Sequence, residues 1–183
     1  MKKAVRTISV LLVLAMLAAF AACGSDPKEE EPEDLAGKPF NNELDMAVVI
    51  NGKKYPVRVD SKQILADLGD GYEYGETVSC VYEGYDKTYT YPDIVVSTVP
   101  DGDTDIIEMF TINGKSASTT RNITVGATKE EVIAAYGDNY WDDGYMNYTE
   151  SGDENNISEM RIQFELENDV VKHIFIYSPS YSN

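Results

Sequence analysis

Apolar residues recur at helical spacing in two short segments of the chain, residues 60–68 and 128–136, which match at an offset of 68 positions. Each segment carries one apolar stripe of the kind that a helix buries against a sheet. The two stripes consist of Ile64, Leu65 and Leu68, and of Val132, Ile133 and Tyr136. This match predicts two equivalent amphipathic helices.

Start and stop signals flank both segments. An N-cap side chain accepts a bond from an unpaired backbone N–H of the first turn, and an acid or amide three residues later can complete a capping box. A glycine after the last turn suits the left-handed backbone that ends many helices. The predicted N-caps are Asp60 and Thr128, their capping-box partners are Gln63 and Glu131, and the terminating glycines are Gly69 and Gly137.

Short runs rich in β-branched and aromatic residues follow each helix, and turn residues separate them, which predicts antiparallel strands. Residues 160–166 alternate apolar and polar side chains, as in a strand with one buried and one solvated face. Asn51-Gly52 predicts a tight hairpin between strands at residues 46–50 and 53–59. Further strands are expected at residues 77–82, 87–91, 94–99, 105–112, 144–149, 159–166 and 170–177.

The apolar stripe of a short helix needs a sheet face against which it can be buried. Each helix with its following strands therefore predicts a two-layer α+β unit whose sheet keeps one face exposed. The motif Ile-Asn-Gly-Lys at residues 50–53 recurs at residues 112–115, which extends the repeat. We expect two tandem helix-plus-antiparallel-sheet units, at residues 40–112 and 113–183.

The first residues show a different pattern. Three basic residues precede an apolar stretch at residues 8–22, which is too short for a comfortable transmembrane helix and is typical of a secretion signal. Residues 1–22 are thus predicted to be a signal peptide. The following Ala21-Ala22-Cys23 resembles the lipobox of bacterial lipoproteins. That resemblance implies that Cys23 carries fatty acyl chains such as palmitate and anchors the mature protein at the extracellular face of the cell membrane.

An acidic linker follows the predicted lipidation site, and we assign it to residues 23–39. Residues 26–34 hold six acids, two prolines and no apolar residue, so they are predicted to be disordered. Without residues 1–22 the chain has 12 basic and 32 acidic residues, a net charge of −20. This charge argues against nucleic acid as a partner and against membrane contact other than through the lipid anchor.

The motif at residues 125–137, Val-Gly-Ala-Thr-Lys-Glu-Glu-Val-Ile-Ala-Ala-Tyr-Gly, resembles the helix motif of beta-lactamase-inhibitor-protein-like (BLIP-like) domains and of the related SmpA/OmlA lipoproteins. The mature chain also resembles lipoproteins of Gram-positive gut bacteria. The resemblance covers residues 46–177 as two tandem copies. It implies two tandem helix-plus-sheet units that form a saddle, whose concave sheet face grips a protein. It does not imply a beta-lactamase target, because no target-gripping residue of the inhibitor can be matched and its disulfides are absent.

One acidic run has the spacing of a metal site. Asp101, Asp103 and Asp105 open like a calcium loop, but an EF-hand needs Gly at its sixth position and an acid at its twelfth, where this chain has Ile106 and Ile112. The same residues also form a standard turn between two strands. We favour the turn, keep weak calcium binding as the alternative, and expect no other metal and no cofactor.

Catalytic signals are sparse. His173 is the only histidine, and we interpret it as a strand residue rather than as part of a zinc site or a nucleophile pair. Cys80 is interpreted as a small buried apolar residue, with a reactive thiol as the alternative. We therefore predict that the protein is not an enzyme, with an unrecognised hydrolase as an alternative.

Aromatic residues are in surplus, since 13 Tyr and one Trp exceed what two small cores require. Tyr is common in strands because it suits a half-buried pleat, yet Tyr and Trp also anchor protein interfaces. The expected function is binding of a protein or peptide through the sheet face; the alternative is binding of a cell-wall or other polysaccharide. The candidate binding residues are Tyr89, Tyr91, Trp141, Tyr145 and Tyr148.

Overall fold

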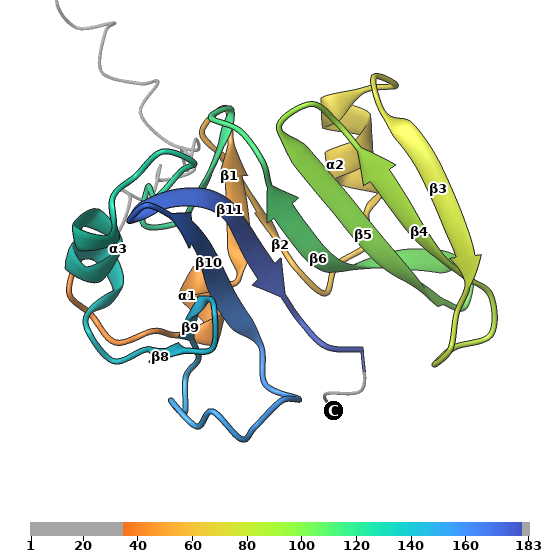
Figure 1. Cartoon of the computed structure of the whole chain (residues 1–183). Coiled ribbons are helices and arrows are strands. Elements are labelled where there is room, and N and C mark those ends of the chain that lie inside the picture. Colours follow the sequence, from red (N-terminus) through yellow and green to blue (C-terminus); the bar gives the residue numbers. More distant parts are fainter. Residues whose placement is uncertain (1–34, 181–183) are drawn as a thin grey trace, which may run out of the picture. The chain divides into compact units, whose positions relative to one another are not determined.

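The computed structural model describes residues 35–180, so the predicted signal peptide, Cys23 and the acidic run at residues 26–34 lie outside the described residues. The described part is mostly β-structure with three short helices (Figure 1). None of these helices is long and apolar enough to cross a bilayer. The helices are α1 (Asn42–Asp45), α2 (Lys62–Leu68) and α3 (Lys129–Tyr136). The strands are β1 (Ala47–Ile50), β2 (Lys53–Pro56), β3 (Glu73–Val78), β4 (Tyr85–Thr90), β5 (Ile94–Asp101), β6 (Thr104–Ile112), β7 (Ala117–Thr119), β8 (Trp141–Asp142), β9 (Met146–Tyr148), β10 (Arg161–Glu167) and β11 (Val170–Tyr177).

The strands form one large and one small antiparallel sheet. The large sheet has eight strands in the order β3-β4-β5-β6-β11-β10-β9-β8. It consists of two four-stranded meanders, and the last strand of each, β6 and β11, pair with each other. The prediction of two separate units is corrected here: their strands share one sheet. The pairing of β6 with β11 also satisfies backbone groups that would be unpaired if each meander ended in a free edge strand.

The small sheet, in the order β2-β1-β7, mixes strands from both predicted units. Asn51 and Gly52 between β1 and β2 have φ of 51° and 78°, as a type I′ hairpin requires, so the predicted hairpin is confirmed. The second Asn-Gly ends β6 but makes no hairpin. Its Gly114 lies so close to Asp93 that a Cβ would come within 2.2 Å of the Asp93 carboxylate.

Helix α3 forms as its sequence predicts. The Thr128 hydroxyl accepts a bond from Glu131 N at 3.2 Å, and the Glu131 carboxylate accepts one from Thr128 N at 2.7 Å. This is the complete capping box. Gly137 follows with φ of 86°, in the positive region that glycine adopts without strain.

Helix α2 begins differently from its expected counterpart. The residue at its N-cap is Ser61, which makes no side-chain cap bond, so the prediction of Asp60 as N-cap is wrong. Asp60 instead forms a β-bridge with Ile106, although its carboxylate still accepts a bond from Lys62 N at 3.0 Å. The terminating Gly69, with φ of 73°, is as predicted.

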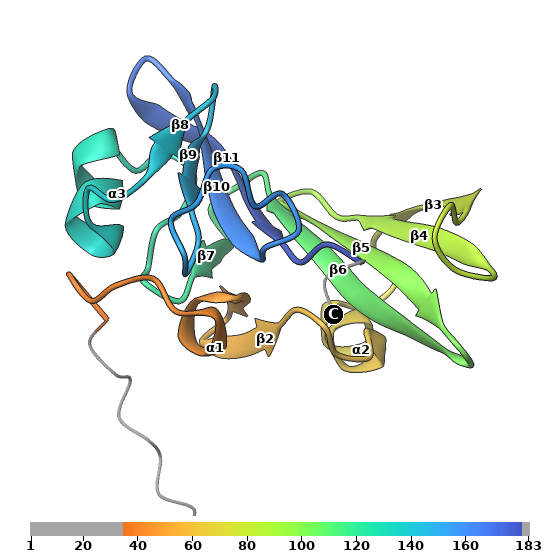
Figure 2. The same ribbon diagram turned by 90° about the horizontal axis from the view of Figure 1, so that it is seen from below.

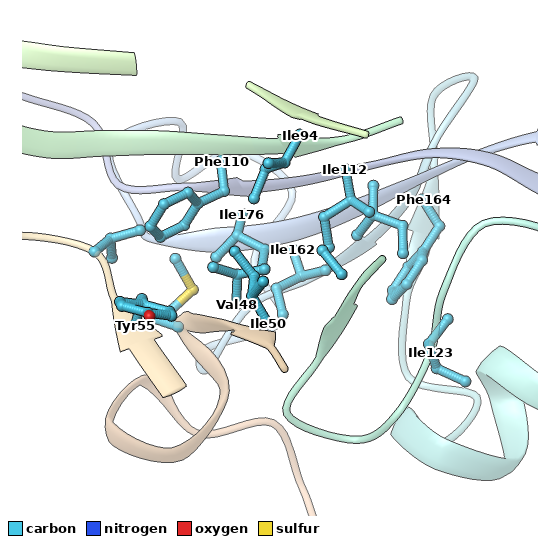
Figure 3. Close-up of a cluster of buried hydrophobic side chains, with 14 of the residues drawn as sticks. Val48, Ile50, Tyr55, Ile94, Phe110, Ile112, Ile123, Ile162, Phe164 and Ile176 are labelled. Atoms are coloured by element: carbon cyan, nitrogen blue, oxygen red, sulfur yellow. The ribbon is translucent and has the colours of Figure 1, made fainter. Parts of the chain in front are cut away.

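One face of the large sheet is covered. Figure 2 shows α1, α2 and β2 on the same side of it. Figure 3 shows the core that this packing creates, in which side chains of the large sheet meet those of the small one. Burial of each such side chain contributes about 1.5–3 kcal/mol. The core residues labelled there are Val48, Ile50, Tyr55, Ile94, Phe110, Ile112, Ile123, Ile162, Phe164 and Ile176.

A buried ion pair connects the start of the described chain to α3. Arg121 and Asp45, whose side chains are 1% and 0% exposed, make two bonds of 2.7 Å. The Arg121 guanidinium also donates to four carbonyls, those of Leu35, Lys38, Pro39 and Ala135, at 2.7–3.0 Å. Residues 35–39, which we assigned to the disordered linker, are therefore fixed to the domain.

Candidate functional site

The register of the large sheet identifies the side chains on its other face. Ile162 and Phe164 of β10 are buried in the core, so Gln163 between them points to the opposite side. We call that side the uncovered face, because no helix or strand of residues 35–180 lies over it in Figure 2. One row across the strands reads Trp141, Asn147, Gln163, Phe175, Thr111, Val95 and Thr90. The next row reads Arg161, Tyr177, Met109, Ser97 and Thr88.

Four half-buried aromatic residues gather on the uncovered face, and we call them the aromatic strip: Trp141, Tyr145, Phe175 and Tyr177. The Tyr145 and Phe175 rings meet edge to face, with centroids 5.8 Å apart. Phe175 and Tyr177 are two residues apart on β11 and so share a face. The Arg161 guanidinium lies 5.8 Å from the centroid of the Tyr177 ring. The strip therefore offers apolar area with a cation beside it.

Asn147 supports the strip from below. This amide is fully buried, which is costly unless its polar atoms are paired. Its Nδ2 donates to the Tyr145 carbonyl and to the Asp143 carboxylate, both at 2.8 Å, and its Oδ1 accepts from Gln163 Nε2 at 2.7 Å. These bonds fix the turn between β8 and β9 and thereby position Trp141 and Tyr145.

A polar pair lies next to the strip. His173 Nδ1 is 2.9 Å from Glu165 Oε2, and both side chains are about one-third exposed, at 32% and 31%. The His173 ring centroid is 6.3 Å from that of Phe175. Within residues 35–180, no group of three or more His, Cys, Asp or Glu residues is placed to hold a metal ion. The arrangement supplies hydrogen-bonding groups at the margin of an apolar surface.

Three of the five predicted binding residues lie on the covered face, so their prediction is wrong. Tyr89, Tyr91 and Tyr148 are buried, and burial raises the pKa of each phenol. Two of them have a structural role instead. Tyr91 donates to the Gly69 carbonyl at 2.9 Å, and Tyr148 donates to the Gly137 carbonyl at 2.8 Å. Each hydroxyl satisfies a carbonyl at the end of a helix.

The acidic run of the calcium alternative is a turn. Asp101 pairs with Thr104, and Gly102 between them has a φ of 58°, which confirms the predicted turn. The Asp105 carboxylate bonds to Lys87 Nζ at 2.8 Å, and this bond raises the pKa of Lys87. Asp105 is therefore engaged with a cation and does not converge with Asp101 and Asp103, so the calcium alternative is not retained.

Cys80 is exposed, so the interpretation as a buried apolar residue is wrong. It lies in the connection between β3 and β4. The edge strand β3 pairs with β4 alone, so no further strand of the sheet lies beside this connection. The thiol is therefore accessible to solvent.

Comparison of the chain with protein-family models, with curated proteins and with solved structures gives no match. The resemblance to BLIP-like domains accordingly stays a prediction from the sequence motif. Function depends on a site rather than on a fold, so the uncovered face is the feature of this domain that bears on it.

Sequence reasoning missed Phe175, Tyr177 and the Asn147–Gln163 pair. A signal for the first two was present: Ile174 and Ile176 alternate with them, so a strand that buries the isoleucines must turn both aromatics outward. No comparable signal identifies Asn147, because its neighbours in the sequence are all bulky and its role depends on the turn between β8 and β9.

Proposed function

We propose that the protein is a non-enzymatic binding module that holds a protein or peptide on the uncovered face of its large sheet. The observation that carries this proposal is the aromatic strip, four half-buried aromatic side chains on a sheet face without a covering element. Aromatic side chains contribute large contact areas at little cost in side-chain entropy, and they dominate binding hot spots. The His173–Glu165 pair and Arg161 supply polar contacts at the margin.

We also propose that the domain arose from two BLIP-like units. Helix α2 with β3–β6 and helix α3 with β8–β11 have the same element order, and the two meanders meet through their last strands. The tyrosine that bonds the terminating glycine comes in each case after or within the second strand of the meander, as Tyr91 and Tyr148. This shared hydrogen bond supports duplication, because the packing of an apolar core does not by itself require a tyrosine at this position in both units.

For its location, we propose attachment to the outer surface of the cell membrane by a lipid on Cys23. The support is the signal-like pattern of residues 1–22 and the alanines before the cysteine. The described domain begins at Leu35, so residues 24–34 lie between lipid and domain.

The test compares the uncovered face with an exposed apolar residue elsewhere. Mature wild-type protein is used to select ligands from a displayed library of random peptides and is probed on a glycan array. The double variant Trp141→Ala/Phe175→Ala should bind the selected peptides at least about 10-fold more weakly, since hot-spot residues contribute 2 kcal/mol or more. The control Ile157→Ala removes an exposed apolar side chain from the loop before β10, outside the strip, and should bind as wild type does.

Unchanged peptide binding by the double variant would contradict the proposed site. Binding of glycans without binding of any peptide would overturn the protein partner and support the polysaccharide alternative. A urea denaturation curve of each variant separates lost contacts from lost folding.

A further inference from the structure

The two edges of the large sheet differ. At one end, β8 has only two residues, which is a usual way to protect an edge. At the other end, β3 has six residues, all of them exposed, and it lies outermost on the right of Figure 1. It contains no proline, no lysine and no register shift against β4. This edge therefore lacks three of the features that prevent another strand from pairing with it, and its charged side chains are Glu73 and Glu76 alone.

Backbone groups of β3 point outward in a predictable alternation. Ser79 N donates to Gly84 O at 3.0 Å, so the pair 79/84 is hydrogen-bonded. In an antiparallel ladder the hydrogen-bonded pairs alternate with unbonded ones. The N–H and C=O groups of Tyr74, Glu76 and Val78 therefore point away from β4. Among residues 35–180 no backbone partner takes up these groups.

An apolar surface adjoins this edge. Five of the eight exposed large hydrophobic residues in the described part lie on β3 or in its hairpin with β4, with exposed fractions between 38% and 71%. Contiguous exposed apolar area of this kind marks interaction sites in soluble domains. The five residues are Tyr74, Val78, Val81, Tyr82 and Tyr85.

The negative charge around β3 indicates which kind of strand can bind at this edge. Residues 70–86 include five acids and no Lys or Arg. A second copy of this strand paired about Glu76 would place the two Glu76 carboxylates next to each other, and like charges on paired strands are destabilising. Glu76 lies across from Lys87 of β4, whereas Glu73 lies across from Thr90. A strand that carries Lys or Arg beside Glu73 would therefore gain from its carboxylate.

We propose that β3 binds an extended, basic segment of another protein by strand addition. The segment continues the sheet through main-chain bonds to Tyr74, Glu76 and Val78. Its apolar side chains contact Tyr74 and Val78 on one face of β3. Its basic side chains lie beside Glu73 on the other face, because residues an odd number of positions apart point to opposite faces of a strand. Main-chain bonds give such a site its affinity, and side-chain contacts give it specificity. The site is distinct from the uncovered face.

The probe is a fluorescein-labelled peptide of alternating Lys and Val, titrated with the mature protein at low salt and followed by fluorescence anisotropy. Two matched peptides serve as controls: one carries N-methyl groups on alternate residues, and one has Glu in place of Lys. We expect both to bind at least 10-fold more weakly than the Lys-Val peptide. The N-methyl peptide keeps every side chain, so its loss reports main-chain pairing.

The matched protein variants are Glu76→Pro and Glu76→Gln. Because the Glu76 N–H points outward, Glu76→Pro removes a donor to the added strand without breaking a bond to β4. We expect it to lose at least 10-fold in affinity, and Glu76→Gln, which keeps the N–H, to stay within threefold of wild type. If Glu76→Pro fails to fold in a thermal melt, the peptide pair on wild-type protein decides the outcome alone.

Three results would overturn the proposal: equal binding of the N-methyl and unmethylated peptides, wild-type affinity in a folded Glu76→Pro variant, or no binding of the Lys-Val peptide up to about 1 mM. The Trp141→Ala/Phe175→Ala variant should bind the peptide as wild type does. Loss of binding in that variant alone would move the peptide to the uncovered face and would also overturn the edge site.

Discussion

The two halves of the large sheet have the same element order but differ at their ends. The half with α3 has a complete capping box, the two-residue edge strand β8 and Arg121, which forms a buried ion pair with Asp45 of α1. The half with α2 has a helix without a side-chain cap, a long exposed edge strand and an apolar hairpin. One half thus contains the interactions that stabilise the fold, and the other exposes groups that a partner can use.

The largest expected effect comes from the ion pairs of the two halves. Arg121→Leu leaves Asp45 buried without its cation, and such a change costs about 3–5 kcal/mol of unfolding free energy. Lys87→Leu breaks the Lys87–Asp105 pair of the other half, whose side chains are each 27% exposed, and should cost at most about 1 kcal/mol. Urea denaturation measures both. Equal losses would contradict the proposed difference between the halves.

The two tyrosine hydroxyls test whether the halves are equivalent. Tyr91→Phe and Tyr148→Phe each remove a bond to the carbonyl of a terminating glycine while keeping the ring. Each should lower the free energy of unfolding by about 1–1.5 kcal/mol, because the carbonyl is left without that donor. Chemical denaturation of the two variants in parallel provides the comparison. A loss in only one of them would weaken the duplication proposal.

A smaller difference is expected at the helix starts. Thr128→Ala removes the capping box of α3 and should cost about 1 kcal/mol. Ser61→Ala removes no cap bond from α2 and should cost less. Amide hydrogen exchange locates the effect: opening of the first turn of α3 should become faster in Thr128→Ala. The capping argument would be wrong if α2 responded more strongly than α3.

The smallest effect concerns acid stability in the α2 half. Bonds from Lys53, Tyr55 and Gln63 lower the pKa of Asp67 from 3.8 to about 2. A carboxyl with a lowered pKa stabilises the folded state above its ordinary pKa, and this contribution disappears as the pH falls from about 4 to about 2. Asp67→Asn should therefore melt lower than wild type at pH 6 and equal to it below pH 2. The exposed Glu154→Gln serves as a control, and a melting difference that persists below pH 2 would contradict this assignment.

Local signals predicted the parts of the fold that depend on local chemistry. The capping box at Thr128, the terminating glycines and the Asn51-Gly52 hairpin each rest on a few adjacent residues, and the structure contains them. The pairing of β6 with β11 and the assembly of β1, β2 and β7 depend on distant segments, so no local pattern indicates them. The α2 start was misjudged for the same reason, since a bridge to Ile106 constrains Asp60.

The candidate site was predicted only in part. Trp141 and Tyr145 lie on the uncovered face, whereas Tyr89, Tyr91 and Tyr148 are on the covered one. Abundance of tyrosine shows that rings are available but not which face of a strand they occupy, and in strands as short as β9 the alternation is too brief to decide. In β11 the alternation is long enough, and it identifies Phe175 and Tyr177.

The most direct test of the account is the oxidation of two methionines. Met109 lies on the uncovered face of β6, and Met146 is buried on the covered face of β9. Folded protein is treated with dilute hydrogen peroxide, and sulfoxide formation at each methionine is followed by mass spectrometry. If the uncovered face is open, Met109 is oxidised at least 10-fold faster than Met146, and a bound peptide from the library selection protects it. Equal rates, or faster oxidation of Met146, would contradict an open binding face on this sheet.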